Sequence, residues 1–295
     1  MKLVIGMPAF NEEKNVKSMI EGIKKLSGTI IVCNDGSNDD TAKIASDLGA
    51  TVISHHKNLG YGEAIKSIFS KFLDVGGDIL VTIDADGQHD PSDIEKIIQP
   101  VIEYQADLVI GSRFLNSQVS RIPSYRKLGI DAITKITNIG IEQKITDSQS
   151  GFRAYTRKAI EQINLNESGM GISTEIIIKA RSKKLKICEV PINISYDGDT
   201  STQNPLLHGT SVMISTIKYT TIGRPLLFFG LPSLIFLALG ITFSYFSISF
   251  YSEVGRLNTN LTIVSITFIM MGLIFFIAAI LLFTIVTLFK EGKNN

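Results

Sequence analysis

An apolar run that ends in two acids occupies residues 79–89, with the sequence ILVTIDADGQH. Residues 79–83 are short and apolar apart from one threonine, which predicts a strand. Asp84 and Asp86 follow at i and i+2, so both carboxylates can face one site as the chain turns. Unpaired, they would repel each other and one would take up a proton, whereas a divalent cation removes that repulsion. Oxygen ligands favour Mg²⁺ or Mn²⁺, so the segment predicts a cation site for a diphosphate, with Gln88 as a further oxygen donor.

The first 111 residues alternate strand-like and helix-like patterns around this segment. The predicted strands are 3–7, 29–32, 51–54, 79–83 and 108–110, and the predicted helices are 12–26, 39–48, 61–73 and 91–104. This alternation predicts an α/β fold with a mostly parallel sheet and helices on both faces. Ligands of such sheets bind outside the carboxyl ends of the strands. We therefore expect one edge of the sheet to gather Asn11, Glu12, Asp35, Asp84, Asp86, Ser112 and Arg113.

Residues 112–224 carry weaker patterns. Helical spacing of apolar residues predicts helices at 126–141 and 173–185, and residues 186–196 are strand-like. Residues 208–224 are interpreted as a juxtamembrane amphipathic helix. A helix in the core of the domain is the alternative for that segment.

The composition changes sharply after Arg224. Only three of the 29 basic residues and two of the 28 acidic residues lie beyond it, and residues 226–246 and 261–289 carry no charge. About 20 apolar residues in a helix cross a hydrocarbon core of roughly 30 Å. We therefore predict a domain of residues 1–207 and a C-terminal hairpin of two transmembrane helices within residues 225–290. The alternative is a buried helical hairpin of a soluble protein.

Basic residues predict the orientation of the hairpin. The cations that flank its outer ends are Lys218, Arg224, Lys290 and Lys293. The connecting loop offers only Arg256, which Glu253 offsets. Since cytoplasmic flanks carry the excess of Lys and Arg, we expect a multi-pass protein of the cell membrane whose N-terminal domain is cytoplasmic.

The chain as a whole has 295 residues and a formal charge of +1, with 44% hydrophobic and 19% charged residues. This apolar content and charge balance exclude a disordered chain. They also argue against a nucleic-acid binder, which needs a basic face to neutralise phosphates. Cys33 and Cys188 lie in apolar strand-like runs, which indicates core thiols in a reducing compartment rather than a disulfide scaffold or a metal site.

Six short motifs are distributed over residues 1–224. They are PAFNE (8–12), NDGSND (34–39), NLG (58–60), DADGQH (84–89), GSRF (111–114) and DSQSGFR (147–153). In this order they resemble the family 2 glycosyltransferases of GT-A fold. Within that family the chain is similar to polyprenyl-phosphate hexose transferases of the dolichyl-phosphate mannose or glucose synthase type, archaeal members included.

The resemblance implies roles for individual residues. Nucleotide-sugar binding is implied for Pro8, Ala9, Asn11, Glu12, Asp35, Ala85 and Arg113. The implied metal ligands are Asp84, Asp86 and Gln88, with Mg²⁺ or Mn²⁺ as the cofactor. The implied catalytic residues are Asp84, Asp86, Arg113, Arg126 and Asp147, and the implied acceptor-binding residues are Arg126, Ser150 and His208. These residue types match the chemistry, because a metal and guanidinium groups bind phosphates.

Two positions depart from the pattern of the family. Asn34 stands where the family has the first acid of an Asp-Asp-Gly-Ser turn, which weakens one contact but leaves Asp35. Residues 198–201, GDTS, lack the lysine of the Gly-x-Ser-Lys element in mannose synthases. Either His208 takes the role of that lysine or the chain uses a different donor, and we favour a UDP-hexose over GDP-mannose.

The other histidines are less informative. His55 and His56 are interpreted as the solvated end of a strand rather than as a ligand pair. For His89 and His208 the sequence leaves two interpretations open, an ordinary surface residue and a residue of the site.

These features predict an enzyme that transfers a hexose, with inversion, from a UDP- or GDP-hexose to a membrane polyprenyl (dolichyl) phosphate. The product would be a lipid-linked sugar donor for protein or surface glycosylation, such as N-glycosylation. The alternatives are a transferase for a different lipid acceptor and a non-catalytic, transferase-like scaffold. A processive polysaccharide synthase is set aside because the chain has no Trp for a Gln-x-x-Arg-Trp element. We expect no nucleic-acid partner, and the sequence leaves open whether the chain forms a homo-oligomer.

Overall fold

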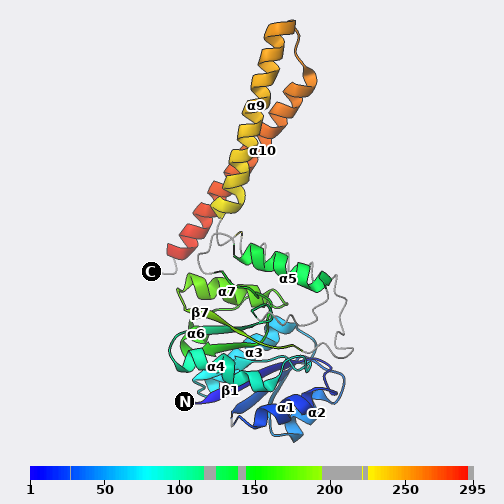
Figure 1. Ribbon diagram of the computed structural model, residues 1–295, viewed down its shortest axis with the longest axis vertical. Coiled ribbons are helices and arrows are strands. Elements are labelled where there is room, and N and C mark those ends of the chain that lie inside the picture. The colour runs from blue at the N-terminus through cyan, green and yellow to red at the C-terminus, as the bar shows by residue number, and fades with distance from the viewer. Residues whose placement is uncertain (27, 116–123, 139–143, 195–220, 222–224, 292–295) are drawn as a thin grey trace. The chain divides into compact units, whose positions relative to one another are not determined.

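The computed structural model describes residues 1–26, 28–115, 124–138, 144–194, 221 and 225–291, with only the backbone for residues 124–128 and 289–291. The chain forms two units, Met1–Ile217 and Lys218–Asn295, which are described separately (Figure 1). The first unit contains a sheet and its helices, and the second contains the long apolar helices.

The sheet of the first unit has seven strands in the order β3-β2-β1-β4-β6-β5-β7. Their bounds are β1 Leu3–Ala9, β2 Thr29–Asn34, β3 Thr51–Ser54, β4 Ile79–Thr82, β5 Leu108–Ser112, β6 Arg153–Thr156 and β7 Ile187–Pro191. Neighbouring strands pair in parallel, except that β6 is antiparallel to both β4 and β5. The predicted α/β fold with a mostly parallel sheet is confirmed.

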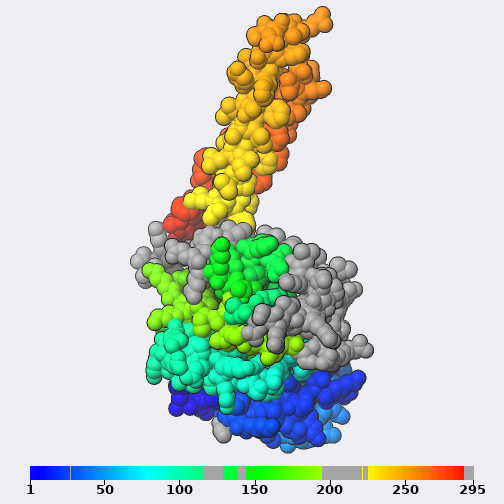
Figure 2. Space-filling model, viewed as in Figure 1, coloured from blue at the N-terminus to red at the C-terminus, as the bar shows by residue number. Residues whose placement is uncertain are grey.

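Helices cover both faces of the sheet. Their bounds are α1 Val16–Lys24, α2 Thr41–Asp47, α3 Tyr61–Asp74, the 3₁₀ turn η1 Pro91–Asp93, α4 Ile94–Ile102, α5 Ser124–Thr137, α6 Arg157–Gln162 and α7 Ile172–Ser182. Side chains alternate along each strand, so Val4 packs in one core with α3, α6 and α7, while Ile5 packs in the other with α1 and α4. Figure 2 shows the side chains of α4 and of the first 50 residues on the surface of this unit that faces the viewer.

β6 and α6 are not predicted by the patterns of the sequence. The first residue of β6 is Arg153, which is 1% exposed, and a charged residue interrupts the apolar pattern that marks a buried strand. Its guanidinium is satisfied by three backbone carbonyls, those of Ser148, Ser150 and Ser173, at 2.7–2.9 Å. A buried charge whose hydrogen bonds are all satisfied is tolerated, so β6 forms although its sequence lacks the continuous apolar pattern of a buried strand.

The second unit is an antiparallel helical hairpin. A π-helical turn, η2 Leu226–Gly230, leads into α9 Leu231–Val254, and α10 Thr259–Glu291 returns after a turn in which Gly255 has a φ of 70°. The apolar helical stretches Leu226–Val254 and Thr259–Leu288 contain 29 and 30 residues, and the most apolar 18-residue windows in them have mean hydropathies of 2.3 and 2.9. Only 11% of the most apolar window of each is buried, which speaks against the core hairpin of a soluble protein. Both helices are long and apolar enough to cross a membrane.

Small residues bring α9 and α10 together. A Cβ on Gly240 would lie 2.6 Å from the Ile269 side chain, so only glycine permits this approach. The Ser247 and Thr262 hydroxyls lie 2.8 Å apart across the pair. Small residues and interhelical hydroxyl bonds are typical of helix pairs in lipid.

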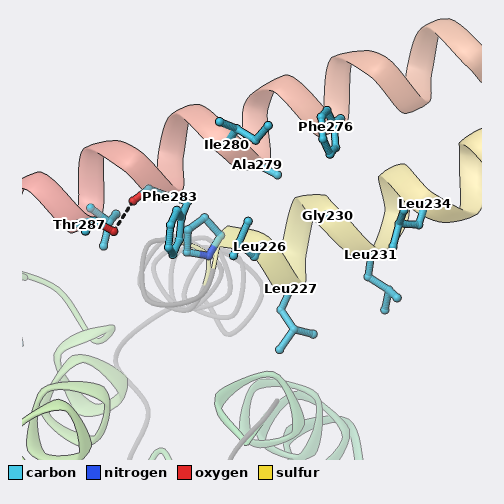
Figure 3. A pocket seen from close by; sticks show the side chains of 12 residues that line it. Leu226, Leu227, Gly230, Leu231, Leu234, Phe276, Ala279, Ile280, Phe283 and Thr287 are labelled. Carbon is cyan, nitrogen blue, oxygen red and sulfur yellow. Dashed lines mark hydrogen bonds between the residues drawn. The ribbon is translucent and has the colours of Figure 1, made fainter.

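A groove of about 650 Å³ lies between the first turns of this hairpin and the end of α10 (Figure 3). Its lining is apolar apart from Thr287, whose hydroxyl donates to the Phe283 carbonyl of the same helix at 2.9 Å. Among the described residues, and apart from the helix's own nearby backbone, no heavy atom lies within 4 Å of the position that a Cβ would take on Gly230, one of the lining residues. The groove therefore continues the apolar surface of the hairpin.

Candidate active site

The carboxyl ends of four strands lie at one edge of the sheet. In the parallel strands β1, β2 and β4, Ala9 pairs with Asn34 and Gly6 pairs with Thr82. β5 runs in the same direction, because β6 is antiparallel to both β4 and β5. The segments that follow these four strands therefore meet at one edge.

The acid pair follows β4. The Tyr61 hydroxyl donates a hydrogen bond to Asp84 Oδ1 at 3.0 Å, and Asp84 Oδ2 lies 3.8 Å from His89 Nε2. The backbone N–H of Gln88 donates to Asp86 Oδ1 at 3.0 Å. Burial, followed by the charge of Asp86, raises the pKa of Asp84 to about 7. The charge of Asp86 thus disfavours the ionisation of Asp84 at one corner of the edge.

The chemistry of this corner fits a divalent cation that is bound partly by the protein and partly by the phosphates of a substrate. Within the described residues no three His, Cys, Asp or Glu side chains are placed to hold a metal ion. Two carboxylates leave the rest of the coordination sphere open, and Mg²⁺ commonly fills it with waters and substrate phosphates. A cation would also offset both causes of the raised pKa of Asp84. Asp84 and Asp86 are the side chains that would hold it, and the Gln88 amide stays a prediction.

The turn after β1 borders the acid pair. Asn11, which has a φ of 57°, accepts a hydrogen bond at Oδ1 from the Asn38 N–H at 2.9 Å and so ties the turns after β1 and β2 together. Burial raises the pKa of Glu12, the Asn15 side chain lowers it, and the nearby Asp86 raises it further. Glu12 therefore belongs to the same electrostatic cluster as the acid pair.

Three of the residues implied to bind the nucleotide are small and buried. They are Pro8, Ala9 and Ala85. The Ala9 carbonyl accepts a hydrogen bond from the Asp35 N–H at 2.9 Å, which joins β1 to the turn after β2. These residues shape the edge of the sheet, and direct contact with a nucleotide stays a prediction for them.

Asp35, which is 4% exposed, anchors the loop before α3. Its Oδ1 accepts the Leu59 N–H at 2.9 Å and lies 2.7 Å from His55 Nδ1. Its Oδ2 accepts the Gly60 N–H at 2.9 Å. His55 Nε2 in turn lies 2.9 Å from the Ser67 hydroxyl on α3. The implied nucleotide-binding acid is thus held by two backbone amides and a histidine.

The interpretation of His55 as a solvated residue is wrong, whereas His56 is exposed as expected. The side chain of His55 is only 10% exposed. Ile53, two residues earlier, packs against the core that contains α3, and residues i and i+2 share a face on extended backbone. Extending the alternation of β3 by one residue would have predicted from the sequence that His55 is buried on the same face as Ile53.

Asn34 takes part in the turn after β2. Its Oδ1 accepts the Ser37 N–H at 3.1 Å, and its Nδ2 donates to the Ser54 hydroxyl at 3.4 Å. Gly36 in this turn has a φ of 73°, and a Cβ there would lie 2.3 Å from the backbone of Lys57. The amide thus holds the turn in place of the acid usual in the family.

Arg113 and Asp147 form a bidentate pair. Arg113 Nε donates to Asp147 Oδ2 at 2.6 Å and Nη2 donates to Oδ1 at 2.7 Å. The side chains are 13% and 0% exposed, respectively. Burial raises the pKa of Asp147, but the charge and hydrogen bonds of Arg113 outweigh it, so the pKa lies below its usual value. Asp147 therefore stays ionised and orients the guanidinium at the edge of the site.

The loop after Asp147 packs directly against the acid pair. A Cβ on Gly151 would lie 2.5 Å from the Tyr61 hydroxyl and 2.6 Å from Asp84 Oδ2, so only glycine fits there. The Thr82 hydroxyl donates to the Gly151 carbonyl at 2.7 Å. Ser150, which is 2% exposed, accepts the Phe152 N–H within this loop, and its predicted role toward the acceptor stays a prediction.

His89 is buried rather than a surface residue, with 6% of its surface exposed. Its ring lies 5.1 Å from that of Phe152, and its Nδ1 has no hydrogen-bond partner among the described residues. Burial, helped by the charge of Arg113 and opposed by Asp147, lowers the pKa of His89 to about 3. The His89 imidazole is therefore uncharged, and it packs beside the acid pair.

Several predicted features lie outside the described residues. Arg126 belongs to α5, but its side chain is not among those described. His208, residues 198–201 and most of the helix expected at 208–224 also fall outside. Their roles stay predictions.

The chain is similar to known glycosyltransferases. The sequence profile of Glycosyl transferase family 2 matches residues 4–163. A UDP-N-acetylglucosamine–dolichyl-phosphate N-acetylglucosaminyltransferase of Methanococcus voltae is 35% identical over 229 residues, covering 70% of this chain and 89% of that protein. A dolichol-phosphate mannosyltransferase of Pyrococcus furiosus is 33% identical over 202 residues, covering 65% of this chain and 56% of that protein.

Solved structures support the same fold. Glucosyl-3-phosphoglycerate synthase of Mycobacterium tuberculosis, crystallised with Mn²⁺ and UDP-glucose, covers 74% of this chain and 79% of its own, with a TM-score of 0.57 and 21% identity. At this identity the likeness concerns the fold alone.

Proposed function

The chain belongs to glycosyl transferase family 2 and is a glycosyltransferase, and from that premise we propose that it transfers a hexose from a nucleotide sugar to a membrane polyprenyl phosphate. The proposal depends most on one observation, the acid pair Asp84 and Asp86 at the carboxyl edge of the sheet. The two apolar helices of the same chain support a lipid acceptor. Relatives named as dolichyl-phosphate transferases support the same acceptor.

On the donor side, the acid pair would hold a divalent cation on the diphosphate of the nucleotide sugar. When bound, that cation supplies positive charge to the leaving diphosphate. Arg113, fixed by Asp147, adds a preorganised guanidinium at the same edge. Preorganised charge of this kind stabilises the charge that develops in the transition state and costs no reorganisation. We favour a UDP-hexose, since the relative from M. voltae is named for a UDP-sugar.

On the acceptor side, a phosphate oxygen attacks the anomeric carbon as the bond to the nucleoside diphosphate breaks. The new bond forms opposite the leaving group, so the configuration of the anomeric carbon inverts. A phosphate is already ionised near neutral pH, so the reaction needs no strong general base. Asp147 accordingly serves as a positioning residue, because its carboxylate is ionised and both of its oxygens accept hydrogen bonds from Arg113.

The membrane location follows from the acceptor. A long prenyl chain leaves the bilayer only at a cost of about 0.8 kcal/mol per CH₂, so the enzyme must work at the membrane surface. The two apolar helices would anchor the catalytic unit there. In this proposal the catalytic unit faces the cytoplasm, which the cations that flank the outer ends of the hairpin support.

A direct assay tests the proposal. Membranes that contain the chain are incubated with radiolabelled UDP- or GDP-hexoses and a short polyprenyl phosphate, with and without a chelator. We expect label in the organic phase that requires the lipid phosphate and is lost with chelator or in Asp86→Ala. Label that stays in the aqueous phase for every donor, or that is unchanged in Asp86→Ala, would contradict the proposal.

A further inference from the structure

Tyr61 is the first residue of α3. Its side chain contacts the acid pair, which follows a different element, the strand β4. Its hydroxyl donates to Asp84 Oδ1 at 3.0 Å. We propose that Tyr61 is a positioning residue that holds one oxygen of Asp84, so that the other oxygen, Oδ2, is presented to the cation. This inference rests on the cation of the proposed function. It adds to the cation site a residue that lies outside the six motifs.

The hydrogen bond from Tyr61 makes the two oxygens of Asp84 different, because only Oδ1 accepts it. An ionised carboxylate only accepts hydrogen bonds, so the phenol must be the donor. Within the described part of the chain Oδ2 accepts no hydrogen bond, and its nearest basic group is His89 Nε2 at 3.8 Å. In this proposal Oδ2, which accepts no hydrogen bond from the described residues, is the oxygen that a metal ion would contact, in a monodentate mode.

The backbone on both sides of Tyr61 is clamped. On the N-terminal side, the Leu59 and Gly60 N–H groups both donate to the buried Asp35. On the C-terminal side, the Gly62 N–H donates to the Ser168 carbonyl at 2.8 Å. Because this backbone is fixed, the phenol does not move when the Asp84 side chain rotates. A group that positions another side chain must itself be held in place in this way.

The far side of the pair is closed by Gly151. A Cβ at that residue would lie 2.5 Å from the Tyr61 hydroxyl, 2.9 Å from Asp84 Oδ1 and 2.6 Å from Oδ2. The Gly151 carbonyl is itself held by the Thr82 hydroxyl at 2.7 Å. Asp84 is thus confined between a phenol and a glycine backbone, and loss of the phenol would free it to rotate.

The expected effect of that loss is weaker cation binding. Partners that orient metal ligands typically contribute 10–100-fold to metal affinity. Without the phenol, Asp84 has more orientations to lose on binding, and its Oδ1 lacks a donor. We therefore expect Tyr61→Phe, which keeps the ring and removes only the hydroxyl, to raise the dissociation constant for Mn²⁺ by about 10–100-fold.

The test is a titration of Mn²⁺ against the full chain in lipid nanodiscs, with UDP and separately with GDP. Free Mn²⁺ is read by electron paramagnetic resonance. Tyr104→Phe is the matched control, because Tyr104 is 86% exposed, and it should bind Mn²⁺ like the unmodified chain. Equal Mn²⁺ affinity in Tyr61→Phe and the unmodified chain would overturn the inference and leave the proposed function standing.

A second measurement separates positioning from damage to the fold. If Tyr61 acts through the cation, hexose transfer by Tyr61→Phe should recover when the Mn²⁺ concentration is raised by the same factor as the dissociation constant. Activity that stays low at every Mn²⁺ concentration would contradict a positioning role. An unmodified chain that binds no Mn²⁺ with either nucleotide would overturn the cation of the proposed function, and the inference with it.

Discussion

The guanidinium of Arg113 and the fully buried carboxylate of Asp147 face each other through two hydrogen bonds, of 2.6 and 2.7 Å, across 34 residues of sequence. An Arg fork and a carboxylate match in geometry, so the pair fixes direction as well as charge. It brings the chain after β5 together with the loop that packs against Asp84.

Removing Arg113 should therefore cost both activity and stability. In Arg113→Ala the Asp147 carboxylate stays buried without its partner, which typically costs about 3–5 kcal/mol. Thermal unfolding followed by circular dichroism should show a clear loss, and transfer should fall by about 100-fold or more. Lys158→Ala, which breaks an exposed ion pair with Asp107, should change the stability by less than about 1 kcal/mol. Similar unfolding curves for the two variants would contradict the account of the buried pair.

His55 should matter for nucleotide binding although it is not expected to touch the nucleotide. His55→Ala removes a donor 2.7 Å from Asp35 Oδ1 and leaves a carboxylate that is 4% exposed with fewer partners. We expect UDP binding, measured by calorimetry with Mn²⁺ present, to weaken by about 10-fold, the cost of one charge-assisted hydrogen bond. The adjacent, exposed His56 gives the matched variant, and His56→Ala should bind UDP normally. Equal affinities in both variants would remove the positioning role of His55.

Gly151→Ala should disable the site while the domain stays folded. The added methyl group would sit within 3 Å of both Tyr61 and Asp84, so one of them must move. We expect transfer to fall by about 10-fold or more, as it does when catalytic groups are displaced by about 1 Å. Gly129→Ala on α5 is the control, because a Cβ there meets nothing within 4 Å among the described residues and helix propensity favours alanine by up to about 1 kcal/mol. Normal transfer by Gly151→Ala would show that this close approach is unimportant.

The acid pair should make stability depend on pH when no divalent cation is present. The pKa of Asp84 is about 7 in the folded chain, above the value of about 3.9 expected when the chain is unfolded. The folded state thus binds the extra proton between these values, and stability is lost as the pH rises from about 4 to about 7.

Replacing Asp84 should remove that loss. With chelator present, Asp84→Asn should melt at least about 2–4 °C above the unmodified chain at pH 8, and close to it at pH 4. Adding Mn²⁺ and UDP at pH 8 should stabilise the unmodified chain and not the variant. A melting difference that does not change with pH would contradict the raised pKa of Asp84.

Much of the fold was predictable from sequence because local patterns determine it. The strands that became β1 to β5 are short apolar runs between amphipathic helices, and each was predicted to within about two residues, inside the ordinary error of element boundaries. The polar residues that follow these strands lie at one edge because parallel strands share a direction. The apolar helices at the C-terminus were equally clear, since their 29 and 30 residues contain almost no charge.

The remaining features depend on contacts between distant residues. The antiparallel β6 begins with a buried arginine whose partners are two carbonyls of the preceding loop and the Ser173 carbonyl in α7. Tyr61 reaches Asp84 across 23 residues, and Gly151 reaches the same acid across a still longer stretch. Nothing in the local sequence marks such pairs, because periodicity records which face is buried and not what is packed against it.

The central claim is that Asp84 and Asp86 hold the cation that carries the diphosphate of the donor. Crystals grown with Mn²⁺ and UDP, with data collected at the manganese edge, test it most directly. We predict an anomalous peak within about 2.2 Å of Asp84 Oδ2 and an Asp86 oxygen, with the diphosphate of UDP on the same ion. An anomalous peak and a nucleotide bound at another edge of the sheet, with the corner between Asp84 and Asp86 holding neither, would contradict it.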